Sequence, residues 1–297
     1  MKRDFSSFPP IGIISYSDFY DIPDPKVWGD YWFKKNLIKE FKSLGYPVDN
    51  SKPKILLHLF GEPLGHISSN PYNILWIHSH PDWIKPEVLR KYQKIYCISK
   101  YFIKKINNMG FNADLLMIPT NMKPMKKRKI YEIIFVGNTK QNKMRKIISD
   151  MGEVPYDIKI WGWGWKGLVP DSRYGGDYYE NSELNELYAS SKIVLNDHHK
   201  DMRREGFINP RVLDVLASGG FVISDSVLGM DELLDNSVAE YNTPDELREL
   251  IDKHMNDDEG RDSLAKRGRR IALKYTYKSS CEKIIRHIES ISGKLFL

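Results

Sequence analysis

The stretch EGFINPRVLDVLASGG occupies residues 205–220 and is followed directly by FVISD, residues 221–225. Asn209 is a favourable N-cap, and Pro210 suits the first helical position because its missing N–H group is not needed there. Gly219-Gly220 ends the helix and lets the chain turn into an apolar strand. We therefore expect a short helix whose N-terminus binds anions through free N–H groups and the helix dipole.

Two charged side chains near the start of this predicted helix indicate its ligand. Arg211 offers a forked cation that suits phosphate oxygens. Asp214, one turn after Pro210, can accept hydrogen bonds from vicinal hydroxyls such as those of ribose. Together they favour a pyrophosphate flanked by sugars. The alternative is an ordinary amphipathic helix with Asp214 exposed.

The rest of the sequence alternates short apolar runs with helical spacing, which predicts an α/β protein with doubly wound parallel sheets. A basic, proline-containing break at 119–129 (PTNMKPMKKRK) is expected to be an interdomain linker. The predicted strands are 11–15, 54–60, 73–78, 94–99, 131–136, 156–161, 191–196 and 221–225, and the predicted helices, besides the quoted one, are 31–44, 86–92, 142–150, 183–190, 243–254 and 279–290.

Length and composition fit two globular domains in a reducing compartment. The chain has 297 residues, 41% of them hydrophobic. Its two cysteines, Cys97 and Cys281, are far apart and lack a CxxC pattern, which argues against a disulfide framework or a cysteine zinc site. Neither a signal peptide nor an apolar run of about 18 residues occurs, so we expect a soluble cytoplasmic protein.

The net charge of +6 is concentrated in one segment: residues 85–129 contain twelve Lys and Arg residues but only Glu87 and Asp114 as acids. One interpretation is a solvated face followed by a charged linker. The other is a surface for an anionic partner, such as a phosphorylated substrate, acidic lipid headgroups or nucleic acid.

The pattern E-G-F-x-x-P…L-D-x-L-A-x-G-G at 205–220 resembles the donor-site signature of GT-B glycosyltransferases, in particular group-1, spore-maturation-protein-like members. This resemblance implies two Rossmann-like domains whose parallel sheets face a central cleft. Residues 1–128 would bind the acceptor and 129–275 the nucleotide-diphosphate sugar, with helix 276–297 packing back on the first domain. In that family two acids flank seven residues. Asp214 matches the second acid; Glu205, which would contact the donor sugar, is separated from Asp214 by eight intervening residues rather than seven.

Four further segments are candidates for the donor site. Gly137 and Asn138 follow a predicted strand, and the resemblance implies that Arg145 on the next helix neutralises the leaving diphosphate. In WGWGW, residues 161–165, Trp165 is expected to stack on a base or sugar, although Trp161 can instead end a strand in the core. His198 and Arg203 follow another predicted strand and are expected to hydrogen-bond donor sugar or phosphate. Adjacent histidines on a strand do not favour a metal site.

The N-terminal half offers candidates for catalysis. In VWGDY, residues 27–31, Asp30 either caps a helix or, by the resemblance, belongs to a loop that closes on the donor. His80 follows a predicted strand, where a histidine can act as general base for an acceptor hydroxyl. A core or capping role is equally compatible with this position.

These features together predict a glycosyltransferase that uses a UDP-, GDP- or dTDP-sugar, with no cofactor and no metal ion. The acceptor would be a glycan or a lipid-linked saccharide, and the basic segment 85–129 would allow peripheral contact with the inner face of a membrane. Three alternatives remain open: a DNA-modifying glycosyltransferase, a nucleotide-sugar epimerase of the same fold, and a non-catalytic nucleotide- or glycan-binding protein.

Overall fold

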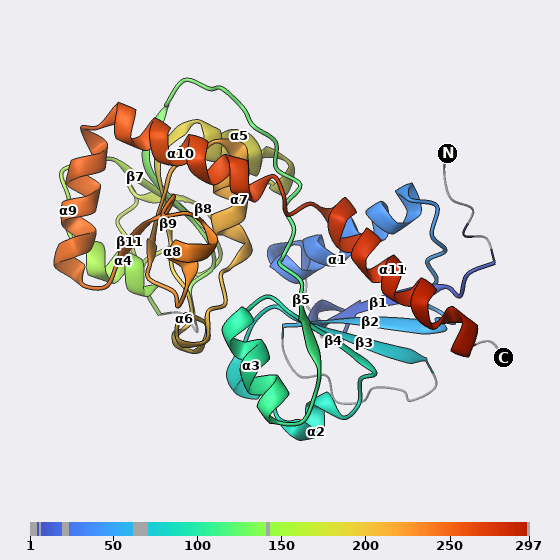
Figure 1. The fold of residues 1–297 in the computed structure, drawn as a ribbon. Coiled ribbons are helices and arrows are strands. Elements are labelled where there is room, and N and C mark those ends of the chain that lie inside the picture. Colours follow the sequence, from blue (N-terminus) through green and yellow to red (C-terminus); the bar gives the residue numbers. More distant parts are fainter. Residues whose placement is uncertain (1–4, 6, 20–23, 62–70, 141–142, 296–297) are drawn as a thin grey trace. The chain divides into compact units, whose positions relative to one another are not determined.

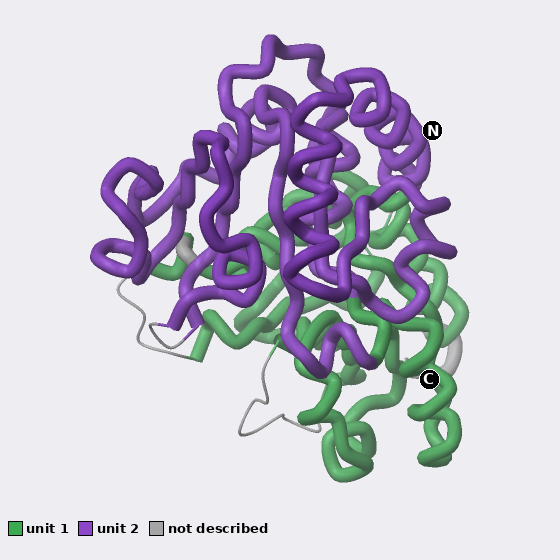
Figure 2. The backbone as a smooth tube through the Cα atoms, turned by 90° about the vertical axis from the view of Figure 1, so that its left-hand side faces the viewer, with its two compact units in different colours: residues 1–119, 205–207, 275–297 green, residues 120–204, 208–274 purple. Residues whose placement is uncertain are grey.

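The computed structural model describes residues 5, 7–19, 24–61, 71–140 and 143–295. The chain divides into two compact units, shown in different colours in Figure 2. Unit 1 comprises residues 1–119, 205–207 and 275–297, and unit 2 comprises residues 120–204 and 208–274. The sequence boundary was expected after Arg128, whereas the structure groups residues 120–128 with unit 2.

Unit 1 is built on a parallel sheet with strand order β1-β2-β3-β4-β5. Ile11 of β1 also forms an isolated parallel bridge with Val48. Every residue of β2 is buried, as expected for a strand with helices on both faces of its sheet. The strands are β1 (Ile11–Ser15), β2 (Ile55–Phe60), β3 (Tyr72–Ile77), β4 (Lys94–Cys97) and β5 (Ala113–Leu115).

Four α-helices flank this sheet, with α1 and α11 on one face and α2 and α3 on the other (Figure 1). Phe33 of α1 packs edge-on against Trp76 of β3, which fixes the helix on the sheet. Helix α11 packs on α1, and its His287 hydrogen-bonds to Tyr72 at 3.1 Å. The helices are α1 (Gly29–Ser43), α2 (Pro86–Leu89), α3 (Lys100–Asn108) and α11 (Tyr277–Leu295), with short 3-10 helices at Tyr16–Asp18, Pro25–Val27 and Pro81–Trp83.

Unit 2 contains a second parallel sheet with strand order β11-β10-β9-β6-β7-β8. This is the Rossmann order, in which the two halves of the sheet diverge from one central pair of strands, here β6 and β9. The strands are β6 (Tyr131–Val136), β7 (Ile158–Trp161), β8 (Tyr174–Gly176), β9 (Ser191–Asn196), β10 (Val222–Asp225) and β11 (Ala239–Tyr241).

Helices cover both faces of this second sheet, with α5 and α7 on one face and α4 and α9 on the other (Figure 1). Helix α10 packs on α7, and together they extend the core beyond the sheet. The helices are α4 (Lys146–Met151), α5 (Leu184–Ala189), α6 (Lys200–Glu205), α7 (Pro210–Ser218), α8 (Met230–Leu233), α9 (Pro244–Met255) and α10 (Asp258–Ala272), with a 3-10 helix at Asn181–Glu183.

The segment expected to be a free linker instead packs on unit 2. Thr120 and Met122 are buried. The Lys123 N–H donates to Asn185 Oδ1 at 2.9 Å, and the Met125 N–H donates to the carbonyl of Ser218 at 3.1 Å. Residues 120–125 are therefore attached to α5 and α7.

Candidate functional site

The candidate site of unit 2 lies where β6 and β9, neighbours in the sheet, end at its carboxyl edge. Strand β6 leads into Gly137 and Asn138, and β9 ends at Asn196, before Asp197. In sheets of this order the crevice beyond these two strand ends is the usual ligand site. We call the side chains gathered here the β6–β9 cluster: Gly137, Asn138, Arg145, Asn196, Asp197, Asn209 and Arg211.

Helix α7 begins at this cluster, as its sequence predicts. Asn209 is the N-cap, with its Oδ1 accepting from the Arg211 N–H at 3.0 Å, and Pro210 occupies the first helical position. The Asn209 Nδ2 group also donates to Asn196 Oδ1 at 2.8 Å and to the Asp197 carbonyl at 3.0 Å. The helix ends at Gly219, whose φ of 82° is left-handed. The N-terminus of α7 is thus tied to the end of β9.

Arg211 projects from the first turn of α7 over the ring of Phe135, with its guanidinium carbon 5.1 Å from the ring centroid. Its Nη1 donates to Asn196 Oδ1 at 2.9 Å. Burial and the nearby Arg145 lower the pKa of Arg211, but an arginine stays charged in a protein. Among the described residues, no carboxylate forms an ion pair with Arg211, so it is available to an anionic ligand.

Arg145 is the second cation of the cluster, and it is already paired. It lies at the N-cap of α4, and its Nε donates to Asp197 Oδ2 at 3.1 Å while Nη2 contacts the other carboxylate oxygen. Its Nη1 donates to the Asn138 carbonyl at 3.2 Å. The Asp197 side chain is only 3% exposed. Arg145 is therefore held in a fixed orientation, with much of its charge balanced.

His198 and Arg203 were expected to hydrogen-bond a donor sugar or phosphate, but in the structure they hydrogen-bond other groups of the protein. The His198 side chain is fully buried; its Nε2 accepts from the Asn209 N–H at 3.0 Å and its Nδ1 lies 2.7 Å from Asp225 Oδ1. A backbone N–H can only donate, so His198 is a neutral Nδ1–H tautomer with both nitrogens occupied. Arg203 donates from Nε to the Ser226 carbonyl at 3.0 Å and lies 3.6 Å from Asp225. His198 thus supports the α7 N-terminus rather than facing a ligand.

The three tryptophans of residues 161–165 have different environments. Trp165, predicted to stack on a ligand, is 0% exposed and donates from Nε1 to the Gly137 carbonyl at 2.7 Å. Trp161 is also buried, whereas Trp163 is 60% exposed. The Trp163 N–H donates to Asn138 Oδ1 at 2.9 Å, and its carbonyl accepts from the Thr139 N–H at 3.0 Å. The stacking assignment to Trp165 is thus corrected: the exposed tryptophan of this segment is Trp163, whose backbone hydrogen-bonds to Asn138 and Thr139, and the W-G-W-G-W spacing does not reveal which ring is exposed.

Asp214 lies one turn further along α7 and is half-buried. Its Oδ1 accepts a hydrogen bond of 2.6 Å from the hydroxyl of Thr120. Burial raises the pKa of Asp214 to about 6, although the Thr120 hydrogen bond and the charge of Arg211 act in the opposite direction. Asp214 is therefore close to Arg211, as expected, and its carboxyl group titrates near neutral pH.

In unit 1, Asp30 lies near the end of β1. Its Oδ2 accepts from the Ser17 N–H at 3.1 Å, while Oδ1 is buried and has no hydrogen-bond partner among the described residues. Burial raises the pKa of Asp30 above its usual value. Asp30 is thus a buried carboxylate beyond the end of β1, with one oxygen not engaged by the part of the chain that the structure describes.

His80 follows β3 in a left-handed conformation with φ of 50°. Its ring stacks on Trp83 with 4.3 Å between ring centroids, and its Nδ1 lies 3.1 Å from the Ser79 hydroxyl. His78, two residues earlier, has a buried Nε2 with no hydrogen-bond partner among the described residues, and burial lowers the pKa of His78 to about 3. Both histidines are half-buried, and the stacking on Trp83 fixes the ring orientation of His80.

Glu205 belongs to unit 1, whereas the β6–β9 cluster belongs to unit 2. It is 3% exposed, and both its carboxylate oxygens contact Nζ of Lys105, at 2.6 and 2.7 Å. Its carbonyl also accepts a hydrogen bond from the Ser99 hydroxyl. Glu205 is therefore bound to α3, within unit 1, through an ion pair that the sequence did not indicate.

Two other features of the described residues bear on the site. No group of three or more His, Cys, Asp or Glu side chains in this part of the chain is arranged to hold a metal ion. None of its helices combines the length and apolar character that a membrane crossing requires.

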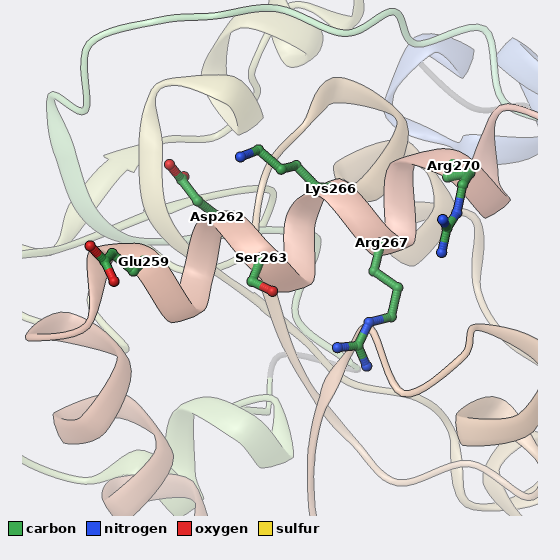
Figure 3. A pocket seen from close by; sticks show the side chains of 6 residues that line it. All are labelled: Glu259, Asp262, Ser263, Lys266, Arg267 and Arg270. Carbon is green, nitrogen blue, oxygen red and sulfur yellow. The ribbon is translucent and has the colours of Figure 1, made fainter.

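A surface hollow of about 440 Å³ lies in unit 2. Figure 3 shows the six side chains that line it. All its lining side chains lie on α10, and none belongs to the β6–β9 cluster. Two of its cations already contact the loop before β11: Arg267 donates to the Asp235 carbonyl at 3.2 Å, and Arg270 lies 3.8 Å from the Asp235 carboxylate. The hollow is a charged helix surface. Its lining residues are Glu259, Asp262, Ser263, Lys266, Arg267 and Arg270.

Comparison with known proteins bears on the fold and on unit 2. Residues 140–286 match the family model described as glycosyl transferase-like. A search of curated proteins gives no match. HepE from Anabaena, solved with UDP and glucose, is similar with a TM-score of 0.67 and 10% identity over 95% of this chain and 100% of that chain.

Two further solved structures are similar. Sucrose-phosphate synthase from Thermosynechococcus elongatus has a TM-score of 0.62 and 11% identity over 89% of this chain and 80% of that chain. An α-glucosyltransferase solved with UDP and a 13-mer DNA containing an HMU base has a TM-score of 0.63 and 12% identity over 94% and 99% of the respective chains. The fold is therefore that of the GT-B glycosyltransferases, as predicted, with a glycosyl transferase-like domain over residues 140–286.

Proposed function

We propose that this GT-B chain transfers a sugar from a nucleoside-diphosphate sugar to an acceptor hydroxyl, and that the nucleotide is UDP. The observation that carries the proposal is Arg211 at the N-terminus of α7, an arginine that forms no ion pair with a carboxylate in the part of the chain that the structure describes. It lies at the switch point of a Rossmann-ordered sheet, where a diphosphate would meet both a cation and free N–H groups. HepE, which has the same fold, was solved with UDP and with UDP-glucose.

The β6–β9 cluster, together with Asp214 and Trp163, would give each part of the donor a partner. Arg211 and the α7 N-terminus would stabilise the charge on the departing diphosphate, and Arg145, oriented by Asp197, would add to that field. Asp214 would accept from the ribose hydroxyls, and the exposed ring of Trp163 would stack on the base. These groups supply positive charge themselves, so the proposal includes neither a metal ion nor another cofactor.

The acceptor would bind to unit 1. Asp30, with its raised pKa and its unused oxygen, suits a general base for an acceptor hydroxyl. His80 would orient that hydroxyl, and Glu205 would act only through its ion pair with Lys105. We propose a glycan or lipid-linked acceptor, with exposed basic residues of segment 85–129 contacting the inner, cytoplasmic face of a membrane. The spore-maturation-protein-like subgroup is proposed from the 205–220 motif alone.

A DNA acceptor is the second candidate. It is favoured by a similar structure, the α-glucosyltransferase solved with UDP and modified DNA, together with the basic segment 85–129. Binding to duplex DNA that weakens steeply with added salt would favour this acceptor over a lipid-linked one.

The test of the donor site is the Arg211→Ala variant. Loss of charge-assisted hydrogen bonds, worth about 1.5–3 kcal/mol, is expected to weaken UDP binding by about 10- to 100-fold in isothermal titration calorimetry. The matched control is Arg248→Ala, because Arg248 pairs with Asp245 on the surface of unit 2. A folded Arg211→Ala protein that binds UDP as tightly as the wild type would contradict the proposal. A thermal-shift comparison of UDP, GDP, dTDP and CMP tests the choice of base.

A further inference from the structure

Thr120 is the first residue of unit 2, and its hydroxyl lies between two partners. Its Oγ1 is 3.1 Å from the Met122 N and 2.6 Å from Asp214 Oδ1. The Met122 N–H can only donate, so Oγ1 accepts from it, and the hydroxyl hydrogen is left for the carboxylate. Thr120 is 4% exposed, so water does not compete for this bond.

The segment that carries Thr120 is itself held in place. Lys123 and Met125 donate backbone hydrogen bonds to Asn185 and Ser218, which belong to α5 and α7. The Ser218 hydroxyl donates to the Asp214 carbonyl at 2.8 Å. The hydroxyl of Thr120 is therefore fixed relative to the helix that carries Asp214, which a flexible linker would not achieve.

We propose that Thr120 is a positioning residue for the donor site: its hydroxyl holds Oδ1 of Asp214 so that Oδ2 accepts from the ribose diol. This inference rests on the proposed function. Among the described residues, Oδ2 of Asp214 has no hydrogen-bond partner, whereas Oδ1 is engaged by Thr120. A carboxylate with one oxygen fixed presents the other in a defined direction, and this preorganisation lowers the cost of binding.

The surroundings of Asp214 make this bond measurable. One other group acts on its charge: Arg211, on the same helix. Arg211 and the Thr120 hydrogen bond both favour the ionised carboxylate, against the effect of burial. Removing the hydroxyl therefore raises the pKa of Asp214, so the ribose contact is lost at a higher pH than in the wild type.

The experiment compares Thr120→Val, which lacks the hydroxyl, with Thr120→Ser, which keeps it. The readout is the ratio of affinities for UDP and 2′,3′-dideoxy-UDP, measured by calorimetry between pH 5 and 8. Both ligands carry the same diphosphate, so its titration cancels in the ratio. In the wild type we expect the preference for UDP to disappear as the pH falls through about 6, where Asp214 becomes protonated.

In Thr120→Val we expect the preference for UDP at pH 7 to fall about tenfold, which corresponds to about 1.4 kcal/mol, with its midpoint at a higher pH. Thr120→Ser is expected to keep the wild-type preference and midpoint. An unchanged affinity ratio and an unchanged midpoint in Thr120→Val would overturn the positioning role. A wild-type affinity ratio that does not depend on pH would overturn it too. The wild-type measurement remains possible even if the valine variant does not fold. Failure of the wild type to bind any nucleoside diphosphate would instead refute the proposed function itself.

Discussion

At residue 137, a β carbon would lie 2.7 Å from Nη2 of Arg211 and 3.3 Å from two ring atoms of Phe135. The carbonyl of the same residue accepts the Trp165 indole N–H. Gly137 therefore leaves the space in which Arg211 lies over Phe135. A glycine is needed here because any side chain would occupy the space of the Arg211 guanidinium.

Replacing Gly137 with alanine is expected to displace the Arg211 guanidinium. We expect UDP affinity to fall by about tenfold or more, with a stability loss of about 1–3 kcal/mol from overpacking. The control is Gly29→Ala, because a β carbon at residue 29 has no neighbour within 4 Å. Calorimetry and thermal melting measure the two effects. Wild-type UDP affinity in Gly137→Ala would show that Arg211 does not need this space.

At the residue scale, the sequence predicts the position of a side chain correctly where that side chain lies on a regular helix or strand. Arg211 and Asp214 lie on a helix whose start was predictable from Asn209 and Pro210, and they are close together as expected. Trp165 and His198 follow strand ends, where irregular backbone decides which side chains are buried. Their burial depends on tertiary partners, Gly137 and Asp225, that spacing does not reveal.

At the element scale, the N-cap of α7 combines stability with the proposed function. Asn209→Ala removes the cap and two hydrogen bonds to the end of β9. We expect a loss of about 1–2 kcal/mol of stability and weaker UDP binding. Thr243, the N-cap of α9, is the matched control, since its hydroxyl accepts from the Glu246 N–H outside the cluster. Urea unfolding measures the stability of the Asn209 and Thr243 variants, and calorimetry measures their UDP affinity. The prediction would be contradicted if both variants lost stability and neither lost UDP affinity.

The elements that the sequence did not predict have few apolar residues or are short. Helix α10 (Asp258–Ala272) is mostly charged, yet it packs closely on α7: a β carbon on its Gly268 would lie 2.4 Å from a Leu216 methyl group. Residues 120–125 likewise contain too few apolar side chains to indicate packing, and they are held by hydrogen bonds. Both are determined by partners distant in sequence.

At the scale of the whole molecule, buried histidines make stability depend on pH. His58 in β2 is 1% exposed, its Nε2 has no hydrogen-bond partner within the described ranges, and burial lowers the pKa of His58 to about 3. The folded protein therefore keeps His58 neutral, whereas the unfolded chain binds a proton below about pH 6.5. As the pH falls from 6.5, this histidine reduces the unfolding free energy by up to about 1.4 kcal/mol per pH unit.

The variant His58→Asn is expected to flatten this dependence. Between pH 7 and 5, it should lose about 2 kcal/mol less unfolding free energy than the wild type. Urea unfolding of the transition that reports on unit 1 measures the difference, and the curves above pH 7, where histidine is neutral in both states, serve as an internal control. Parallel curves down to pH 5 would mean that His58 is protonated in the folded state.

Unit 1 is assembled from three separate stretches of chain, and this has a consequence for synthesis on the ribosome. Helix α11, which packs on α1, is translated only after residues 120–274. The face of α1 that packs on α11 therefore stays exposed until α11 is translated. By that time all strands of the unit 2 sheet have been synthesised, because most of unit 2 is continuous in sequence. We expect the order of folding during translation to be reversed: the second unit folds first, and the first is completed only when α11 has emerged.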